Sequence, residues 1–193
     1  TNGVFKSGVH YEESWAGFKT DSLIPGWSSH QPYNKDRVFE FKATALNGKE
    51  VIINRTWLEG KGKSLLVMDV FGTWCPNCYD EINLLKELKT KYPQVEFLSL
   101  AFERGDKKQA LKRIQNFKTE QEINWDILYG GVAKKQLADS VVPFLGGVKS
   151  FPTSLFYPLN GDPVVHTGFN GPATPFYSNE VEFYEGVIKQ FIE

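Results

Sequence analysis

Residues 65–78 read LLVMDVFGTWCPNC, and this stretch decides the fold class and the chemistry. Its first half, Leu65–Phe71, is a nearly continuous apolar run, which is typical of a strand buried on both faces. A helix is predicted directly afterwards over Pro76–Tyr92, because proline suits a first helical turn and apolar residues recur on one face. Pro93 then ends the helix. Cys75 and Cys78 therefore lie between a buried strand and the start of a helix.

Strands and helices alternate along the rest of the chain from about residue 38. A β-hairpin is predicted around the Asn47-Gly48 dipeptide, which favours a tight turn. Asn179 followed by Glu182 resembles a capping box at the start of a closing helix. This order indicates an α/β domain. The further predicted strands are Val95–Phe102, Trp125–Tyr129, Ser154–Tyr157 and Pro163–Thr167, and the further predicted helices are Lys107–Phe117, Ala133–Asp139 and Asn179–Ile192.

The length of 193 residues suits one domain with an appendage. Residues 37–193 are predicted to form the domain. Residues 1–36 combine turn formers and scattered aromatics with weak periodicity, and they are interpreted as an irregular arm that packs its aromatics onto the domain. The alternative for this arm is the tail of an upstream domain.

Charge and hydropathy exclude several classes of partner. The net charge is −1, which gives no electrostatic basis for binding nucleic acid or an anionic membrane surface. The longest purely apolar stretches are about four residues, far short of the roughly 20 that a membrane span needs. We therefore expect neither a nucleic-acid partner nor a membrane span in this chain.

The chain has only two cysteines, and they are spaced as Cys75-Pro76-Asn77-Cys78. The first turn of a helix carries unpaired N–H groups and a partial positive charge, which stabilise a thiolate on Cys75. Cys78, one turn later, should be less exposed and able to attack a mixed disulfide held on Cys75. A purely structural disulfide is the alternative. A metal site is not expected, because no second cysteine pair exists and the three histidines are dispersed; no cofactor is expected either.

Two acidic residues flank the cysteine pair. Asp69 lies inside the apolar strand, where burial would raise its pKa and allow proton exchange near neutral pH. Glu81 lies three residues after Cys78, close to the same helix face, where it could exchange the Cys78 proton. The alternatives are an Asp69 turned to water or to backbone, and a solvated Glu81 that only complements the helix dipole.

These residues resemble the active-site signature of the thioredoxin superfamily. Trp74 precedes the first cysteine, and Asp69 matches the family's buried acid. Phe151-Pro152-Thr153, before a strand, is similar to the family's cis-proline loop. The resemblance implies a cis Phe151–Pro152 bond, and a loop that faces the cysteines and offers backbone to an extended substrate. It thus implies a docking surface made by Trp74, Phe151 and Pro152.

Within that superfamily, the chain is most similar to the TlpA/ResA-type thiol–disulfide oxidoreductases. An N-terminal hairpin precedes the core, extra structure near 107–129 lies between the second core strand and the cis-proline loop, and Glu81 matches an active-site glutamate. The Pro76-Asn77 dipeptide departs from the thioredoxin Gly-Pro, so the redox direction stays open. The fold class expected is therefore a thioredoxin-like α/β fold with a hairpin and a central insertion.

The expected function is thiol–disulfide exchange with a protein substrate, most simply as a reductase recharged by a thiol electron donor. The catalytic residues expected are Cys75 and Cys78, with Asp69 and Glu81 as proton carriers. The resemblance implies a periplasmic or otherwise extracytoplasmic location, with tethering through a segment absent from this sequence. Two alternatives remain: a non-catalytic binding module with a structural disulfide, and a thiol peroxidase. The peroxidase motif would need Thr and Pro where Gly72 and nearby residues stand.

Overall fold

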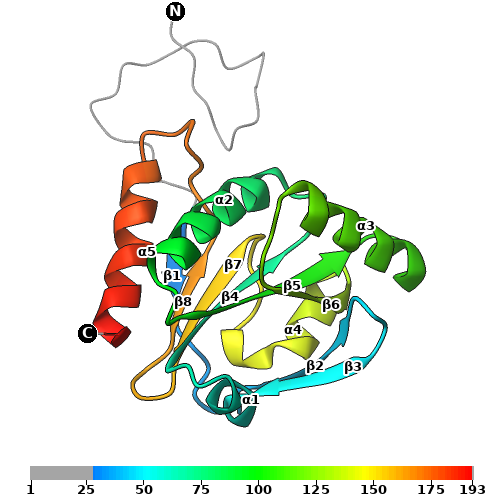
Figure 1. Ribbon diagram of the computed structural model, residues 1–193, viewed down its shortest axis with the longest axis horizontal. Coiled ribbons are helices and arrows are strands. Elements are labelled where there is room, and N and C mark those ends of the chain that lie inside the picture. The colour runs from blue at the N-terminus through cyan, green and yellow to red at the C-terminus, as the bar shows by residue number, and fades with distance from the viewer. Residues whose placement is uncertain (1–27, 193) are drawn as a thin grey trace, which may run out of the picture.

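The computed structural model describes residues 28–192, which form an eight-stranded sheet with helices on both faces (Figure 1). The strand order is β1-β8-β7-β4-β5-β6-β2-β3. The strands are β1 (Ser29–Gln31), β2 (Glu40–Ala45), β3 (Glu50–Asn54), β4 (Leu65–Phe71), β5 (Glu96–Glu103), β6 (Asp126–Val132), β7 (Thr153–Pro158) and β8 (Val164–Thr167). The helices are α1 (Arg55–Gly60), α2 (Pro76–Lys91), α3 (Lys107–Glu120), α4 (Lys135–Val141), the short 3₁₀ helix η2 (Pro143–Leu145) and α5 (Tyr177–Ile192).

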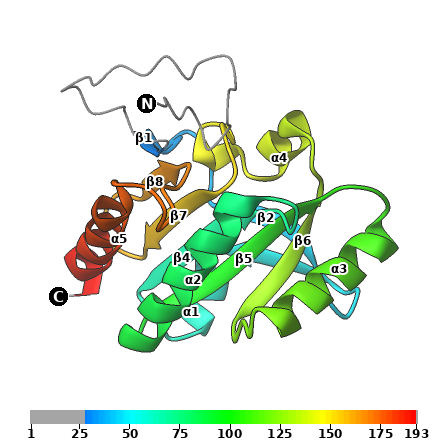
Figure 2. The ribbon, with the colours of Figure 1, turned by 90° about the horizontal axis from the view of Figure 1, so that it is seen from above.

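Strand β4 lies in the middle of the sheet, parallel to β5 and antiparallel to β7. All seven of its residues are buried, as its apolar sequence predicts. Val67 and Phe71 pack into the core beneath α2, α3 and α5, whereas Leu66 and Met68 pack into the core on the α1 and α4 side. Figure 1 shows α2 and α4 on opposite sides of the central strands, and in Figure 2, seen from above, α2 lies over β4 and β5. Asp69 shares the face of Val67 and Phe71, so its carboxyl lies beneath α2.

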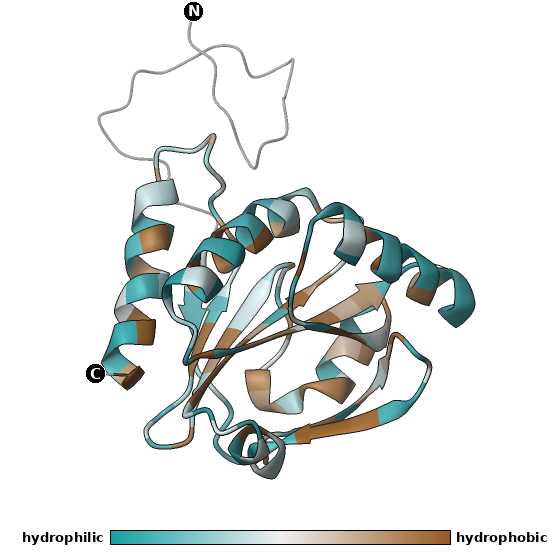
Figure 3. Ribbon diagram, in the orientation of Figure 1, coloured by the Kyte–Doolittle hydropathy of each residue, from teal (hydrophilic) through white to brown (hydrophobic). Residues whose placement is uncertain are grey.

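Helix α2 begins at Pro76 and ends at Lys91, with Tyr92 as its C-cap. The predicted helix therefore has the correct start and an end within one residue. Its buried positions include Ile82, Leu85 and Leu88, while its opposite face is polar. The hydropathy colouring shows the same division, with apolar residues concentrated in the central strands and polar residues along the outer faces of the helices (Figure 3).

The predicted hairpin and central insertion are both present. Strands β2 and β3 pair antiparallel across the Asn47-Gly48 turn, where Gly48 has a φ of +84° that glycine adopts readily. Elements α3, β6 and α4 lie between β5 and the loop that contains Pro152. Strand β6 extends the sheet beyond β5, and β2 joins it through two residue pairs. The hairpin is thus attached to the core through the insertion.

Helices α1 and α5 both differ from the sequence predictions. Helix α1 was not predicted; Asn54 caps it by accepting a hydrogen bond from the Trp57 N–H at 2.9 Å. Helix α5 begins at Tyr177, so Asn179 lies inside its first turn and the predicted capping box is wrong. The chain already turns before Asn179, because the Phe176 carbonyl accepts a hydrogen bond from the Asn179 N–H at 3.1 Å.

Most of the predicted arm, residues 1–27, lies outside the described residues. Its described part contributes Ser29–Gln31 as edge strand β1, which pairs antiparallel with β8. The Gln31 side-chain amide donates to the carbonyls of Leu145 and Gly147 at 2.7 and 2.8 Å. This segment therefore ties the edge of the sheet to the loop after η2.

Candidate active site at Cys75 and Cys78

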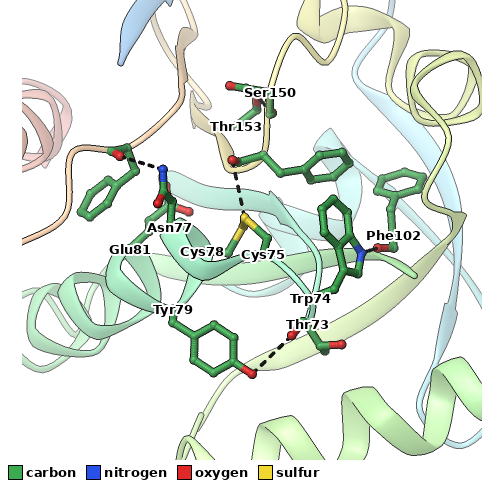
Figure 4. The surroundings of a disulfide bond; sticks show 12 residues. Thr73, Trp74, Cys75, Asn77, Cys78, Tyr79, Glu81, Phe102, Ser150 and Thr153 are labelled. Carbon is green, nitrogen blue, oxygen red and sulfur yellow. Dashed lines mark hydrogen bonds between the residues drawn. A yellow bond between two sulfur atoms is a disulfide. The ribbon is translucent and has the colours of Figure 1, made fainter. Parts of the chain in front are cut away.

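The two cysteines form a disulfide at the N-terminus of α2 (Figure 4). Cys75 is the N-cap residue and Cys78 lies in the first turn, with their Cα atoms 5.3 Å apart. Cys75 is 5% exposed and Cys78 is fully buried. This is the predicted arrangement: the first cysteine is the more accessible one, and both lie at the positive end of the helix dipole.

The loop before β7 faces the disulfide. The Phe151–Pro152 peptide bond is cis, as the resemblance implied. The Phe151 carbonyl oxygen lies 3.5 Å from the Cys75 Sγ (Figure 4). The Pro152 carbonyl accepts a hydrogen bond from the Gly168 N–H at 2.8 Å, which joins this loop to the loop after β8. The site is thus built from three neighbouring segments: the turn between β4 and α2, the loop before β7 and the loop after β8.

Trp74 lies beside Cys75 and is held from two sides. Its Nε1–H donates to the Phe102 carbonyl at 3.0 Å, and its ring meets Phe151 edge-on with centroids 5.3 Å apart. This position requires Gly72, because a Cβ there would lie 2.4 Å from Trp74 Nε1 and 2.9 Å from the Phe102 carbonyl oxygen. The predicted docking residues Trp74, Phe151 and Pro152 therefore lie together around Cys75.

A row of polar side chains crosses the sheet beneath α2. In the strand register, Asp69 of β4 lies opposite Ser99 of β5 and Ser154 of β7. The Ser99 hydroxyl donates to Asp69 Oδ1 and accepts from Trp125 Nε1–H at 2.7 Å. Asp69 Oδ2 has no hydrogen-bond partner among residues 28–192. Burial raises the pKa of Asp69 from 3.8 to about 7, although the Ser99 hydrogen bond opposes that rise.

Glu81 points from α2 into the same buried region. It is fully buried, so the solvated alternative is excluded. The hydroxyls of Ser154 and Tyr184 both donate to its Oε1 and lie 3.0 Å apart, while its Oε2 has no hydrogen-bond partner among the described residues. Burial, and next the nearby Asp69 carboxyl, raise the pKa of Glu81 to about 8. Two buried carboxyls therefore titrate in the neutral range and influence each other.

A third buried acid, Glu103 at the end of β5, was not predicted from the sequence. Its carboxylate accepts from the Thr73 N–H at 2.7 Å and from the Thr73 hydroxyl at 3.0 Å. Arg113 Nε donates to the same carboxylate at 3.1 Å. Glu103 therefore fixes the backbone immediately before Trp74. An acid at the end of an apolar strand was the available sequence signal.

A fourth buried acid, Glu180, was also not predicted from the sequence. Glu180 is buried in α5, and its Oε2 lies 2.8 Å from Nε2 of the buried His166. Its Oε1 accepts from the N–H and side-chain amide of Asn170. The loop fixed in this way also approaches the cysteines, since Asn77 donates to the Phe169 carbonyl at 3.4 Å. No role was predicted for the histidines, because His166 and Glu180 meet only through the tertiary fold.

A pocket of about 540 Å³ lies elsewhere, between the hairpin, α1 and the start of β6, and its walls include Val51, Trp57 and Ile127. Within residues 28–192, no group of three metal-ligating side chains is positioned to hold an ion. No helix in the same range is long and apolar enough to cross a membrane.

Comparison with known proteins gives structural matches only. No protein-family model matches the chain, and no curated protein matches its sequence. It is similar to a protein assigned as the thiol:disulfide interchange protein DsbE of Chlorobium tepidum, at 20% identity and a TM-score of 0.60, over 86% of this chain and 100% of that one.

Two further solved structures have the same architecture. One is a DsbF homologue from Corynebacterium diphtheriae, at 18% identity and a TM-score of 0.59, over 89% of this chain and 98% of that one. The other is a secreted disulfide oxidoreductase of Mycobacterium tuberculosis homologous to E. coli DsbE, at 23% identity and a TM-score of 0.53, over 78% and 95%. The predicted thioredoxin-like fold is confirmed.

Proposed function

We propose that this thioredoxin-like chain is a thiol–disulfide oxidoreductase that reduces disulfides in protein substrates. One observation carries the proposal: a Cys75–Cys78 disulfide at a helix N-terminus lies against the Phe151 carbonyl and beside two buried carboxyls whose pKa values lie near neutrality. A structural disulfide needs neither a facing loop nor titratable groups beside it, and closing so short a loop stabilises a fold little.

The reaction begins with the reduced pair. The Cys75 thiolate, stabilised by the helix N-terminus, attacks one sulfur of the substrate disulfide. The substrate S–S bond breaks, its other sulfur leaves as a thiolate and takes a proton, and a mixed disulfide to Cys75 forms. Cys78 then gives its proton to a carboxylate and attacks the Cys75 sulfur. The second substrate sulfur leaves, so the substrate gains two electrons and the Cys75–Cys78 disulfide is regenerated.

Asp69 and Glu81 are the proposed proton carriers. A base that serves a thiol at neutral pH works best with a pKa near that pH, and burial brings both carboxyls into this range. Each also keeps one carboxyl oxygen without a hydrogen-bond partner among residues 28–192. Glu81 lies on the same helix as Cys78, three residues later, which makes it the nearer candidate for the Cys78 proton.

A protein substrate fits the docking surface. Trp74 and Phe151 form an aromatic rim, and the backbone of Phe151, whose carbonyl faces Cys75, offers groups to an extended chain in the manner of an added strand. A separate thiol donor must return two electrons to the disulfide after each turnover. An extracytoplasmic location is proposed with this function; the secreted Mycobacterium tuberculosis relative supports it.

Trapping the intermediate tests the proposal. The reduced Cys78→Ala protein should form a stable mixed disulfide with a disulfide-containing protein such as insulin, visible as a mass adduct that dithiothreitol removes. The Cys75→Ala protein should form none, because Cys78 is buried. Equal adducts in both variants, or none in either, would instead favour the binding-module alternative. A turnover of hydrogen peroxide in the wild type would favour the peroxidase.

A further inference from the structure

The rim of the site beside Trp74 carries an unpaired cation. The Arg104 side chain is exposed, and its guanidinium lies 4.6 Å from the centre of the Trp74 ring. No carboxylate among residues 28–192 forms an ion pair with it. Stacking on an aromatic ring occupies the flat face of a guanidinium and leaves its N–H groups free in the plane, where they match a carboxylate. Arg104 therefore lies exposed on Trp74 with no ion-pair partner among residues 28–192.

The acidic residues around Arg104 are already engaged. Glu103 is buried and binds Thr73 and Arg113. Asp106 caps α3 by accepting the Gln109 N–H at 3.0 Å. Arg113 balances the charge of Glu103, and neither Glu103 nor Asp106 forms an ion pair with Arg104.

Two further cations lie in neighbouring loops at this end of the sheet. Lys134 follows Ala133, whose N–H donates to the Glu103 carbonyl at 2.8 Å. Lys149 precedes the Phe151–Pro152 loop by two residues. Both lysines are exposed, and neither forms an ion pair with a described residue. Three exposed cations, Arg104, Lys134 and Lys149, therefore lie in loops at this end of the sheet.

We infer that Arg104 selects substrates that carry an acidic residue beside the target disulfide. A chain crossing the Trp74 and Phe151 rim to reach Cys75 passes the Arg104 guanidinium. A carboxylate there would accept charge-assisted hydrogen bonds, whereas a lysine or arginine would be repelled. The inference rests on the proposed function and adds the chemical class of its substrate.

The test compares three peptides that differ only at the residues flanking one internal disulfide, which are Asp, Asn or Lys. The reduced protein is mixed with each peptide, and the second-order rate constant for reduction of the peptide disulfide is measured at low and high salt. The aspartate peptide should react about 5-fold faster than the lysine peptide at low salt, and the difference should shrink at high salt. Arg104→Glu should reverse this order.

Two variants separate selection from other effects. Lys49→Glu makes the same change in net charge at the distant, exposed hairpin turn and should keep the wild-type order. Arg104→Gln should remove most of the preference. If Arg104→Gln slowed all three peptides equally, Arg104 would act on the cysteines and the inference would fail. Equal wild-type rates for all three peptides would also overturn it. A wild type that reduces not even the asparagine peptide would instead refute the proposed function.

Discussion

Replacing Glu81 with glutamine should stabilise the oxidised protein at pH 7 and leave its stability nearly unchanged at pH 4.5. Folding buries this carboxyl completely and raises its pKa from 4.5 to about 8. Between these values the folded chain keeps a proton that the unfolded chain releases. Stability therefore falls as pH rises through this window, because the native state binds more protons.

The size of the effect follows from the shift. Each pH unit between 4.5 and about 8 lowers the free energy of unfolding by about 1.4 kcal/mol. By pH 7, burial of Glu81 therefore lowers it by about 3 kcal/mol relative to pH 4.5. Glutamine keeps an acceptor for Ser154 and Tyr184 but never ionises, so it removes this cost. Asp69, whose pKa burial raises to about 7, adds a slope of the same sign that remains in the variant.

The assay is urea unfolding followed by tryptophan fluorescence at pH 4.5, 6, 7 and 8. Glu87→Gln is the matched control: it makes the same chemical change on an exposed position of α2 and should stay within about 0.5 kcal/mol of wild type at every pH. If Glu81→Gln lowered stability at pH 7, or shifted it equally at pH 4.5 and pH 7, the reasoning about a buried, protonated Glu81 would be refuted.

Two other substitutions test the surroundings of the site. Gly72→Ala should destabilise the fold by about 1–3 kcal/mol in denaturant titrations, because its Cβ would collide with Trp74, whereas Gly60→Ala, with no neighbour within 4 Å, should have little effect. Glu180→Gln should lower stability at pH 7 by about 1–3 kcal/mol. Burial alone would raise the pKa of Glu180, but hydrogen bonds from His166 and Asn170 outweigh it and lower the pKa, and the ionised form holds the loop. Contributions of this kind are present above pH 4.5 and are lost in acid, so the wild type and Glu180→Gln should converge as the pH falls; a constant gap would contradict this explanation.

The central part of the fold could be predicted from local sequence alone. The apolar run Leu65–Phe71 is a strand because seven consecutive buried positions need an interior on both sides. Pro76 marks the start of α2 because proline lacks the N–H that a first turn cannot use. These two signals place both cysteines at the start of a helix that follows a buried strand. Asp69, inside that strand, was correctly expected to be buried.

The partners of the buried carboxyls could not be predicted, because they depend on strand register. Ser99 and Ser154 meet Asp69 only through the pairing of β5 and β7 with β4. Tyr184 reaches Glu81 from α5, more than 100 residues away in the chain. A single sequence contains no signal for such distant contacts, which is also why Glu81 remained compatible with a solvated position.

The most direct test of the account is a glutathione redox titration of the folded chain, read by thiol alkylation and mass. A reversible two-electron transition of Cys75 and Cys78, with a potential below about −230 mV, is the predicted result for a reductase. A potential near −120 mV would contradict the direction and indicate an oxidase. A pair that does not cycle at all in the folded protein would contradict the catalytic function itself.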